Sequence, residues 1–528
     1  MRVQALAPAA QARWVALAND ALAQVSLRPA EVTAWWRLVS ATAALPSGPR
    51  DEAVARLQQL PVSAALPAWL RLSALWCLTG DLQHLMQMTA LAPQLPGTDR
   101  WMALSIVLWG AALSRCENRH AFRQVLVDGQ ISQLMDQLGR GLARPAATGA
   151  PPAAVHRVAL YTPHLASGAH AGTAMTFNLQ ALLARQGIET QVFAGQELSI
   201  PDMRTYFAGG DHSTVGPAQS SSWPVRSAGD LKVSLADADF SLDARWRDML
   251  ALIGAYAPDL VLYVGFASPV VWPLHARWPV VGMSLHTLPP VAPVDVWLNA
   301  DPEPDPSLAW PGIVAPEPVH FPHRFWPAEP APGCSRETLG IGHDAVLCVS
   351  SGSRLSDEMT DSWTLGVTAV LDRHPKVHWL LIGVPEHRAA RLATLHARAR
   401  CMPFQDNFAG WLQLADLYLN PPRLGGGASV ATAMSLGVPV LSLAGSDGGD
   451  KVGDHAVVTI AQYMNRFVEW IDHPDRRHAA GQAMKARFDE VLDLSTGRAA
   501  SRLLQACQRA VRLYQIRQTA AESTRPLP

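Results

Sequence analysis

A glycine-rich turn followed by a helical pattern gives this chain its clearest candidate for chemistry. The glycines are Gly425, Gly426 and Gly427, and the helical pattern starts near Ala428. The first N–H groups of a helix have no partner within the helix, and the helix dipole favours an anion at the same end. Glycine lets the backbone approach a phosphate because it has no Cβ, and Ser429 adds a hydroxyl donor. We therefore expect this turn to hold the diphosphate of a nucleotide.

The glycine turn differs from two common phosphate-binding signatures. No Gly-Lys-Ser/Thr follows the glycines, so the segment is not a Walker loop, and their spacing is not G-x-G-x-x-G. Taken alone, the segment is explained equally well as a tight turn inside any α/β domain. The interpretation as a phosphate site therefore depends on the elements around it.

Two histidines and an arginine are further candidates. His170 lies in a glycine-flanked loop after a predicted strand, and His286 follows another predicted strand. Histidine titrates near neutral pH, so either could move a proton in catalysis. Arg354 follows a strand, and its planar guanidinium suits phosphate oxygens. Each residue also has a structural explanation. A lone histidine such as His170 is more often structural than catalytic, His286 could cap a turn, and Arg354 could cap the preceding strand.

Aromatic and metal-binding patterns are less specific. Phe408 and Trp411 could stack on a nucleotide base, although their spacing also suits a helix packed on a core. The Asp-Ala-Asp at 237–239 is a three-residue match that is frequent by chance, and His320 and His323 lack further ligands at zinc spacing. We expect no metal site and no cofactor.

Composition excludes several classes of protein. The chain has 528 residues, which is enough for two or three domains, and a formal net charge of −1. That charge gives no general attraction to nucleic acid or to anionic lipid. The six cysteines are far apart, which favours reduced thiols and a cytoplasmic location. The N-terminus has no signal-peptide pattern, and the apolar run 260–271 is too short to span a bilayer.

The predicted elements that position these residues fall into three regions. Residues 1–145 show apolar positions at helical spacing and no strand alternation, which predicts an all-α domain without a clear repeat. Strands and helices then alternate through 155–325 and again through 333–515, which predicts two Rossmann-like lobes with parallel sheets. The polar span 195–239 is expected to be a loop, and the proline-rich crossing 302–332 is expected to separate the two lobes. The predicted fold class is therefore α/β, with two Rossmann-like lobes preceded by an all-α domain, and ligands in the cleft at the strand ends.

The predicted elements of the two lobes can be stated by range. The strands are 158–161, 190–193, 260–264, 280–283 and 294–298 in the first lobe, and 346–350, 377–382, 417–420 and 438–443 in the second. The helices are 171–185 and 241–255 in the first lobe, and 357–371, 386–400 and 428–436 in the second.

The segment around the glycine turn resembles the donor-binding half of GT-B glycosyltransferases. The pattern is L-A-D-L-Y-L-N, then G-G-A-S, then A-M-S-L-G-V-P-V-L-S-L-A-G-S and K-V. It is most similar to the O-linked N-acetylglucosamine transferase group, which includes bacterial cytoplasmic N-glycosyltransferases that modify adhesins. The Gly-Ala-His at 168–170 and the segments 281–288 and 295–306 resemble other motifs of that group. The resemblance covers about residues 155–510, and its most specific part is 413–451.

The chain also departs from the family pattern. The threonine-rich loop of the family corresponds to Gly427, Ala428 and Ser429, and its ribose-binding acid corresponds to Thr432. Asp447 or Asp450 is a candidate for the role of that acid. Arg354 is the candidate for the phosphate-binding lysine of the family, and Lys451 is the second candidate. The paired glutamates of many retaining GT-B enzymes are absent, since Leu424 and Thr432 stand at those positions.

The resemblance implies a hexosyltransferase-type enzyme that moves a sugar from a nucleotide diphosphate, with a UDP-sugar favoured, to a protein side chain. It also implies an inverting and metal-independent reaction, with adhesins, flagellins or other surface proteins as candidate acceptors. Ser429 and Arg354 are expected to hold the diphosphate, and His170 to serve the reacting centre. The alternatives are a GT-B-like nucleotide-sugar epimerase or hydrolase, and a non-catalytic helical adaptor with a degenerate GT-B body.

Overall fold

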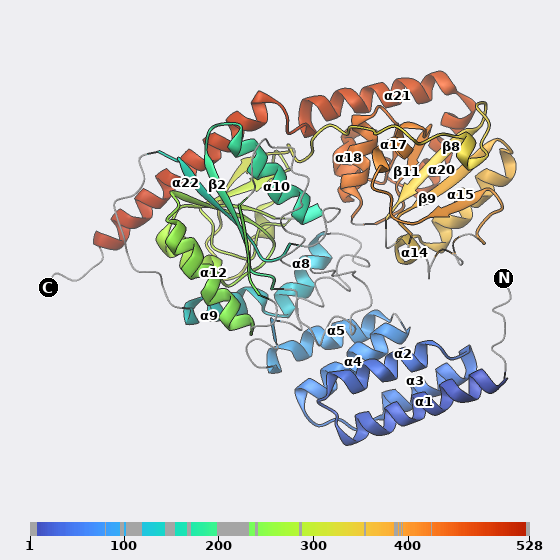
Figure 1. Cartoon of the computed structure of the whole chain (residues 1–528), viewed down its shortest axis with the longest axis horizontal. Helices are drawn as coiled ribbons and strands as arrows, with labels where there is room; N and C mark the ends of the chain where they lie inside the picture. Colours follow the sequence, from blue (N-terminus) through green and yellow to red (C-terminus); the bar gives the residue numbers. More distant parts are fainter. Residues whose placement is uncertain are drawn as a thin grey trace.

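The computed structural model contains an N-terminal helical layer and two α/β lobes (Figure 1). It describes residues 8–79, 81–95, 100–101, 119–142, 154–165, 171–197, 232–237, 241–284, 288–352, 355–384, 389, 392, 394–423 and 425–523. Within these ranges no helix is both long and apolar enough to cross a membrane. The predicted fold class, two Rossmann-like lobes preceded by helices, is confirmed.

The N-terminal layer consists of short helices that pack around buried tryptophans. Its helices are α1 (Pro8–Leu27), α2 (Val32–Ala43), α3 (Ser47–Gln59), α4 (Ala65–Thr79) and α5 (Leu82–Leu91). Trp35 and Trp69 are fully buried in its core, so the expectation that tryptophans here form the core is confirmed for both. The Trp35 indole N–H donates to the Pro29 carbonyl at 2.8 Å, which satisfies its one polar group.

Two later helices, α8 (Arg119–Asp128) and α9 (Ile131–Gly141), belong to the core of the first lobe rather than to a separate layer. The Phe122 ring stacks on Phe266 with centroids 5.9 Å apart. A Cβ at Gly139 would lie 2.6 Å from the Trp272 side chain, so the glycine permits the close approach of α9 to α13 (Val271–Arg277). The helical part of the chain is therefore joined to the first lobe by packed apolar surface.

The first lobe is a seven-stranded parallel sheet in the order β3-β2-β1-β4-β5-β6-β7. The strands are β1 (Arg157–Thr162), β2 (Glu189–Ala194), β3 (Val233–Leu235), β4 (Leu260–Val264), β5 (Val280–Met283), β6 (Val296–Asn299) and β7 (Glu317–His320). Helix α12 (Leu242–Tyr256) covers one face with α8, α9 and α13, and α10 (Ala171–Ala184) lies on the other face. Both faces are buried, which explains the nearly continuous apolar runs in the central strands.

Two edge strands lie in segments for which the sequence predicts no strand. β3 lies inside the polar span 195–239, so the loop prediction is wrong there, and β7 lies inside the proline-rich crossing 302–332. β3 is only three residues long, and β7 contains Pro318. Short edge strands bury few side chains and tolerate proline, so they leave little apolar pattern in the sequence.

The second lobe is a five-stranded parallel sheet in the order β10-β9-β8-β11-β12. The strands are β8 (Val346–Ser351), β9 (Val377–Ile382), β10 (Ala399–Met402), β11 (Leu417–Leu419) and β12 (Val440–Leu441). The helices are α14 (Leu355–Glu358), α15 (Asp361–Arg373), α17 (Phe408–Gln413), α18 (Gly427–Ser435), α19 (Asp447–Val452), α20 (Ile460–Asp472) and α21 (Pro474–Arg487). The predicted helix 386–400 is wrong at its end, because residues from Ala399 onward form β10.

The C-terminal helix α22 (Gly497–Ser523) leaves the second lobe and packs on the first (Figure 1). Leu503 and Ala506 lie in the same core as strands β1 and β4. Arg509 forms an ion pair with Glu317 at 2.6 Å. The boundary at 515 that was predicted for the second lobe therefore falls within a helix of the first lobe's core.

Candidate functional site

A cavity that is partly open to solvent lies between the two lobes. Its walls come from the first lobe, from the connection between the lobes, and from the second lobe. They are lined by Ala174, Met175, Asn178, Ser284, Trp297, Leu298, Asn299, Ala300, Asp301, Arg324, Phe325, Ala428, Asp447 and Lys451. Several of these follow the carboxyl ends of parallel strands, which is where doubly wound folds bind ligands.

The glycine turn supplies the part of the second lobe that was predicted to bind phosphate. Helix α18 begins at Gly427, one residue before the predicted start, and Ala428 lines the cavity. Gly426 has φ +93°, a left-handed conformation that favours glycine. Gly425 precedes it in the same turn, and Ser429 is half-buried in the first turn of the helix. The sequence therefore predicted both the turn and the helix end that borders the cavity.

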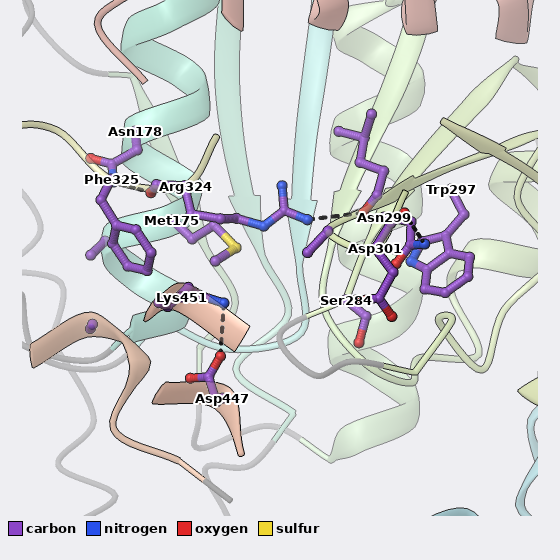
Figure 2. A pocket seen from close by; sticks show the side chains of 14 residues that line it. Met175, Asn178, Ser284, Trp297, Asn299, Asp301, Arg324, Phe325, Asp447 and Lys451 are labelled. Carbon is purple, nitrogen blue, oxygen red and sulfur yellow. Dashed lines mark hydrogen bonds and ion pairs between the residues drawn. The ribbon is translucent and has the colours of Figure 1, made fainter. Parts of the chain in front are cut away.

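The helix end already holds an anion of the protein's own. The Gly427 N–H donates to Asp447 Oδ2 at 2.9 Å, and Lys451 Nζ lies 2.9 Å from Asp447 Oδ1 (Figure 2). Ser446 positions Asp447, because its hydroxyl caps α19 by accepting the Gly449 N–H at 2.9 Å. The expectation that the N–H groups at this helix end are all available to a ligand is therefore wrong for Gly427. Its N–H is occupied by the carboxylate of Asp447, which follows β12.

Thr432 and Asp450 do not line the cavity. The Thr432 hydroxyl donates to the Ala428 carbonyl at 2.9 Å, within its own helix. The Asp450 side chain is exposed, and its carbonyl accepts from Arg487 at 3.3 Å. Of the two acids considered for the ribose, only Asp447 lines the cavity.

Two buried cations border the cavity, one from each side. Lys451 is 7% exposed and belongs to the second lobe. Arg324, also 7% exposed, lies in the connection after β7 and was not predicted. Its guanidinium donates to the carbonyls of Phe321 and Leu298, the latter at 3.1 Å. Figure 2 shows its guanidinium reaching toward Asn299, with Lys451 and Asp447 on another wall.

Burial lowers the pKa of Arg324 to about 9, and the nearby negative charge of Asp447 partly opposes this effect. The residue is therefore cationic at neutral pH. No carboxylate lies within ion-pair distance of the Arg324 guanidinium among the residues that the structure describes. A buried guanidinium that donates only to carbonyls leaves positive charge at the cavity wall that an anionic ligand can neutralise.

A second buried arginine, Arg423, packs against the glycine turn. Arg423 forms an ion pair with Glu358 at 3.0 Å and donates to Asn420 Oδ1 at 2.9 Å and to the Ser351 carbonyl at 3.0 Å. A Cβ at Gly426 would lie 2.4 Å from Arg423 Nε. Arg423 thus connects the ends of β8 and β11, and its close contact with position 426 requires a glycine there. Its role is therefore to position the turn.

A buried carboxyl joins three strand ends of the first lobe. Glu197, which follows β2, accepts from the Tyr161 hydroxyl at 2.5 Å and from the Ser268 hydroxyl at 2.6 Å. Burial raises its pKa to about 7, although these hydrogen bonds act in the opposite direction. The cluster fixes the chain where it leaves β2, and it does not line the cavity.

The remaining predicted residues do not line the cavity or lie outside the described part of the chain. Phe408 begins α17 and packs partly buried against the second lobe's core, as does Trp411. The base-stacking role of Phe408 stays a prediction. His170, His286 and Arg354 lie outside the described residues.

No grouping of three or more possible metal ligands occurs in the part of the chain that the structure describes. His323 is buried, and its Nδ1 lies 3.1 Å from the Asp493 carbonyl, so it is a structural residue of the interlobe connection.

An ion pair connects the helical region to the cavity. Arg119 at the start of α8 lies 2.7 Å from the carboxylate of Asp301, which lines the first-lobe wall. Asn299 donates to the Asp301 carbonyl at 2.9 Å, which fixes the same loop. The helical region therefore helps to shape one wall of the cavity.

No protein-family model matches the chain, and no curated protein matches its sequence. Its structure is similar to that of a mutant O-GlcNAc transferase from Thermobaculum terrenum, with a TM-score of 0.59, 14% identity and 97% of each chain covered. HepE from Anabaena, in complex with UDP-glucose, matches with a TM-score of 0.47 and 13% identity over 66% of this chain and 98% of that one. The spinosyn rhamnosyltransferase SpnG matches with a TM-score of 0.39 and 15% identity over 66% of this chain and 99% of that one. The first likeness extends over both lobes and the helical region, so the fold is that of a GT-B protein.

Proposed function

We propose that this chain is a cytoplasmic glycosyltransferase that moves a sugar from a nucleotide diphosphate, with UDP-sugars favoured, to a protein side chain. One observation carries the proposal: a cavity between two GT-B lobes is bordered by a glycine-preceded helix N-terminus and by two buried cations, Lys451 and Arg324. A nucleotide diphosphate presents the anionic oxygens that such a set of groups can bind.

The same groups suit the charge that develops during transfer. When the sugar leaves, the bond electrons pass to the diphosphate, which gains negative charge. Lys451, Arg324 and the α18 dipole stabilise that charge in a site partly closed to water. Divalent metals supply this stabilisation in other enzymes. We therefore propose a metal-independent reaction for this chain.

Inversion at the sugar carbon requires an acceptor that attacks opposite the leaving diphosphate, aided by a base that removes its proton. His170 is our candidate for that base, and His286 is a candidate for contact with the sugar or the acceptor. These roles, and the inverting outcome, rest on the family resemblance.

The protein acceptor is supported by the fold of the whole chain. The likeness in fold includes a protein named as an O-GlcNAc transferase and extends over 97% of this chain, helical region included. The Arg119 to Asp301 ion pair joins α8 to one wall of the cavity, and we propose that a polypeptide acceptor enters on this side. Adhesins, flagellins and other surface proteins are the acceptors that we would test first.

The proposal can be tested by incubating the purified chain with UDP-hexoses and candidate acceptors, followed by intact-mass analysis. The expected result is a hexose-sized addition to an acceptor, lost in His170→Ala with the melting temperature unchanged. Isomerised or hydrolysed sugar from donor alone, without transfer, would identify an epimerase or hydrolase instead. A chain that neither binds nor consumes any nucleotide sugar would be a non-catalytic adaptor, and the proposal would be wrong.

A further inference from the structure

The anion at the tip of α18 is held by an arrangement of groups that could equally hold a phosphate. Asp447 accepts the Gly427 N–H through one oxygen and the Lys451 ammonium through the other, both at 2.9 Å. A Cβ at position 427 would lie 2.1 Å from Asp447 Oδ2, so only glycine admits the carboxylate this closely. The absence of a Cβ at this position lets the Asp447 carboxylate approach the Gly427 N–H, and it would let a phosphate oxygen approach in the same way.

The contact lies on the wall of the interlobe cavity rather than at an isolated helix end. Asp447, Lys451 and Ala428 all line that cavity, and so does the buried Arg324, whose guanidinium donates to backbone carbonyls. The charge of Asp447 acts on the pKa of Arg324, so the carboxylate and this second cation are close enough to interact. A diphosphate that binds both cations must therefore approach the position of the carboxylate.

The two members of the ion pair differ in their exposure to solvent. The Asp447 side chain is 36% exposed, whereas that of Lys451 is 9% exposed. Water therefore reaches the carboxylate more readily than the ammonium, which is buried beside the cavity. Displacement of Asp447 would then free both the Gly427 N–H and Lys451 for a new anion.

We propose that Asp447 is an internal competitor for the donor's diphosphate: its carboxylate binds the same Gly427 N–H and Lys451 ammonium as a phosphate would, and the nucleotide displaces it on binding. This inference rests on the proposed function and adds a property to it. Asp447 satisfies two buried polar groups, and it weakens the binding of nucleoside diphosphates. It would also favour release of the diphosphate product, because the Asp447 carboxylate can return to the Gly427 N–H and Lys451 as the product leaves.

Two other roles for Asp447 predict different behaviour. If its carboxylate binds the ribose hydroxyls, its loss weakens the binding of every uridine nucleotide. If it only caps α18, its loss lowers stability and leaves binding unchanged. Our proposal predicts tighter binding, and only for ligands that carry a diphosphate. The three roles therefore differ in the sign of one measured effect.

The test is calorimetry of UDP and of uridine with the full chain, its Asp447→Asn variant and a control, Asp454→Asn. Asparagine keeps an oxygen that can accept the Gly427 N–H, so the helix cap is retained while the charge is lost. Asp454 is exposed, lies outside the cavity lining and changes the net charge equally. We expect Asp447→Asn to bind UDP about tenfold more tightly, since a like charge next to a bound dianion is removed. Uridine binding and the Asp454→Asn control should stay within about twofold of the parent chain.

Each result leads to a separate conclusion. Weaker binding of UDP and uridine by Asp447→Asn would show a ribose contact, and unchanged binding of both ligands would show a simple cap; either overturns this inference and leaves the proposed function standing. If neither the parent chain nor Asp447→Asn binds UDP, the proposed function fails.

Discussion

Replacement of Lys451 by methionine tests whether the cavity binds a diphosphate. Methionine is unbranched and of similar length, so it fills the same space and removes only the charge. Lys451 is 7% exposed and lines the cavity, and its ammonium lies 2.9 Å from Asp447 Oδ1. A bound diphosphate would lose one charge-assisted hydrogen bond, and Asp447 would lose the cation that balances its charge.

The expected effect follows from the value of a hydrogen bond to a charged group. Such a bond contributes about 1.5–3 kcal/mol, which corresponds to a roughly 10- to 150-fold rise in the Kd for UDP. The measurement is calorimetry with UDP at low and at physiological ionic strength. Screening by salt should reduce the effect only slightly, because the group is buried.

The matched control is Lys485→Met. Lys485 forms an exposed ion pair with Asp489 at 2.7 Å on α21, and it lies outside the cavity lining. Its loss changes the net charge by the same amount and should leave the Kd within about twofold of the parent chain. A Kd for Lys451→Met within about threefold of the parent value would refute the assignment of Lys451 to the diphosphate.

Three further outcomes are expected. Glu358→Gln should lower the free energy of unfolding by about 3 kcal/mol in urea titrations, because the buried Arg423 loses its counter-charge; a loss under about 1 kcal/mol would contradict the positioning role of that pair. The pKa of Glu197 is raised from 4.5 to about 7, so the folded chain keeps a proton that the unfolded chain releases in this window. Its contribution to stability is complete below pH 4.5, falls by up to about 3 kcal/mol as pH rises to 7, and then levels off. Glu197→Gln should remove this slope in melting temperature, and an unchanged slope would contradict the assignment. Sugar transfer should persist in EDTA, since the cations replace a metal, and restoration of EDTA-inhibited transfer by Mg²⁺ or Mn²⁺ would show a metal requirement.

The sequence predicts the central strands because they are buried on both faces. Strands such as β4 and β9 are continuous apolar runs, and they lie where they were expected. The edge strands β3 and β7 carry no such run, and the sequence does not say on which lobe α22 packs. Elements that carry their own run of apolar residues could therefore be predicted from the sequence. Elements whose position depends on packing against distant parts of the chain could not.

The same division holds for the candidate site. The glycine turn before α18 could be predicted because its backbone needs a positive φ and close approach at residues that are adjacent in the chain. Arg324 was missed because it lies in a proline-rich connection with no motif, and only the fold brings it to the cavity. The use of Gly427 by Asp447 was missed because it joins residues 20 positions apart across a strand.

The location of the phosphates in a structure of this chain with bound UDP is the decisive measurement. We expect the phosphates to lie beside Gly427 N, Lys451 Nζ and the Arg324 guanidinium, with the Asp447 carboxylate turned toward solvent. Phosphates bound elsewhere on the chain, with the Asp447 to Gly427 contact intact, would contradict it.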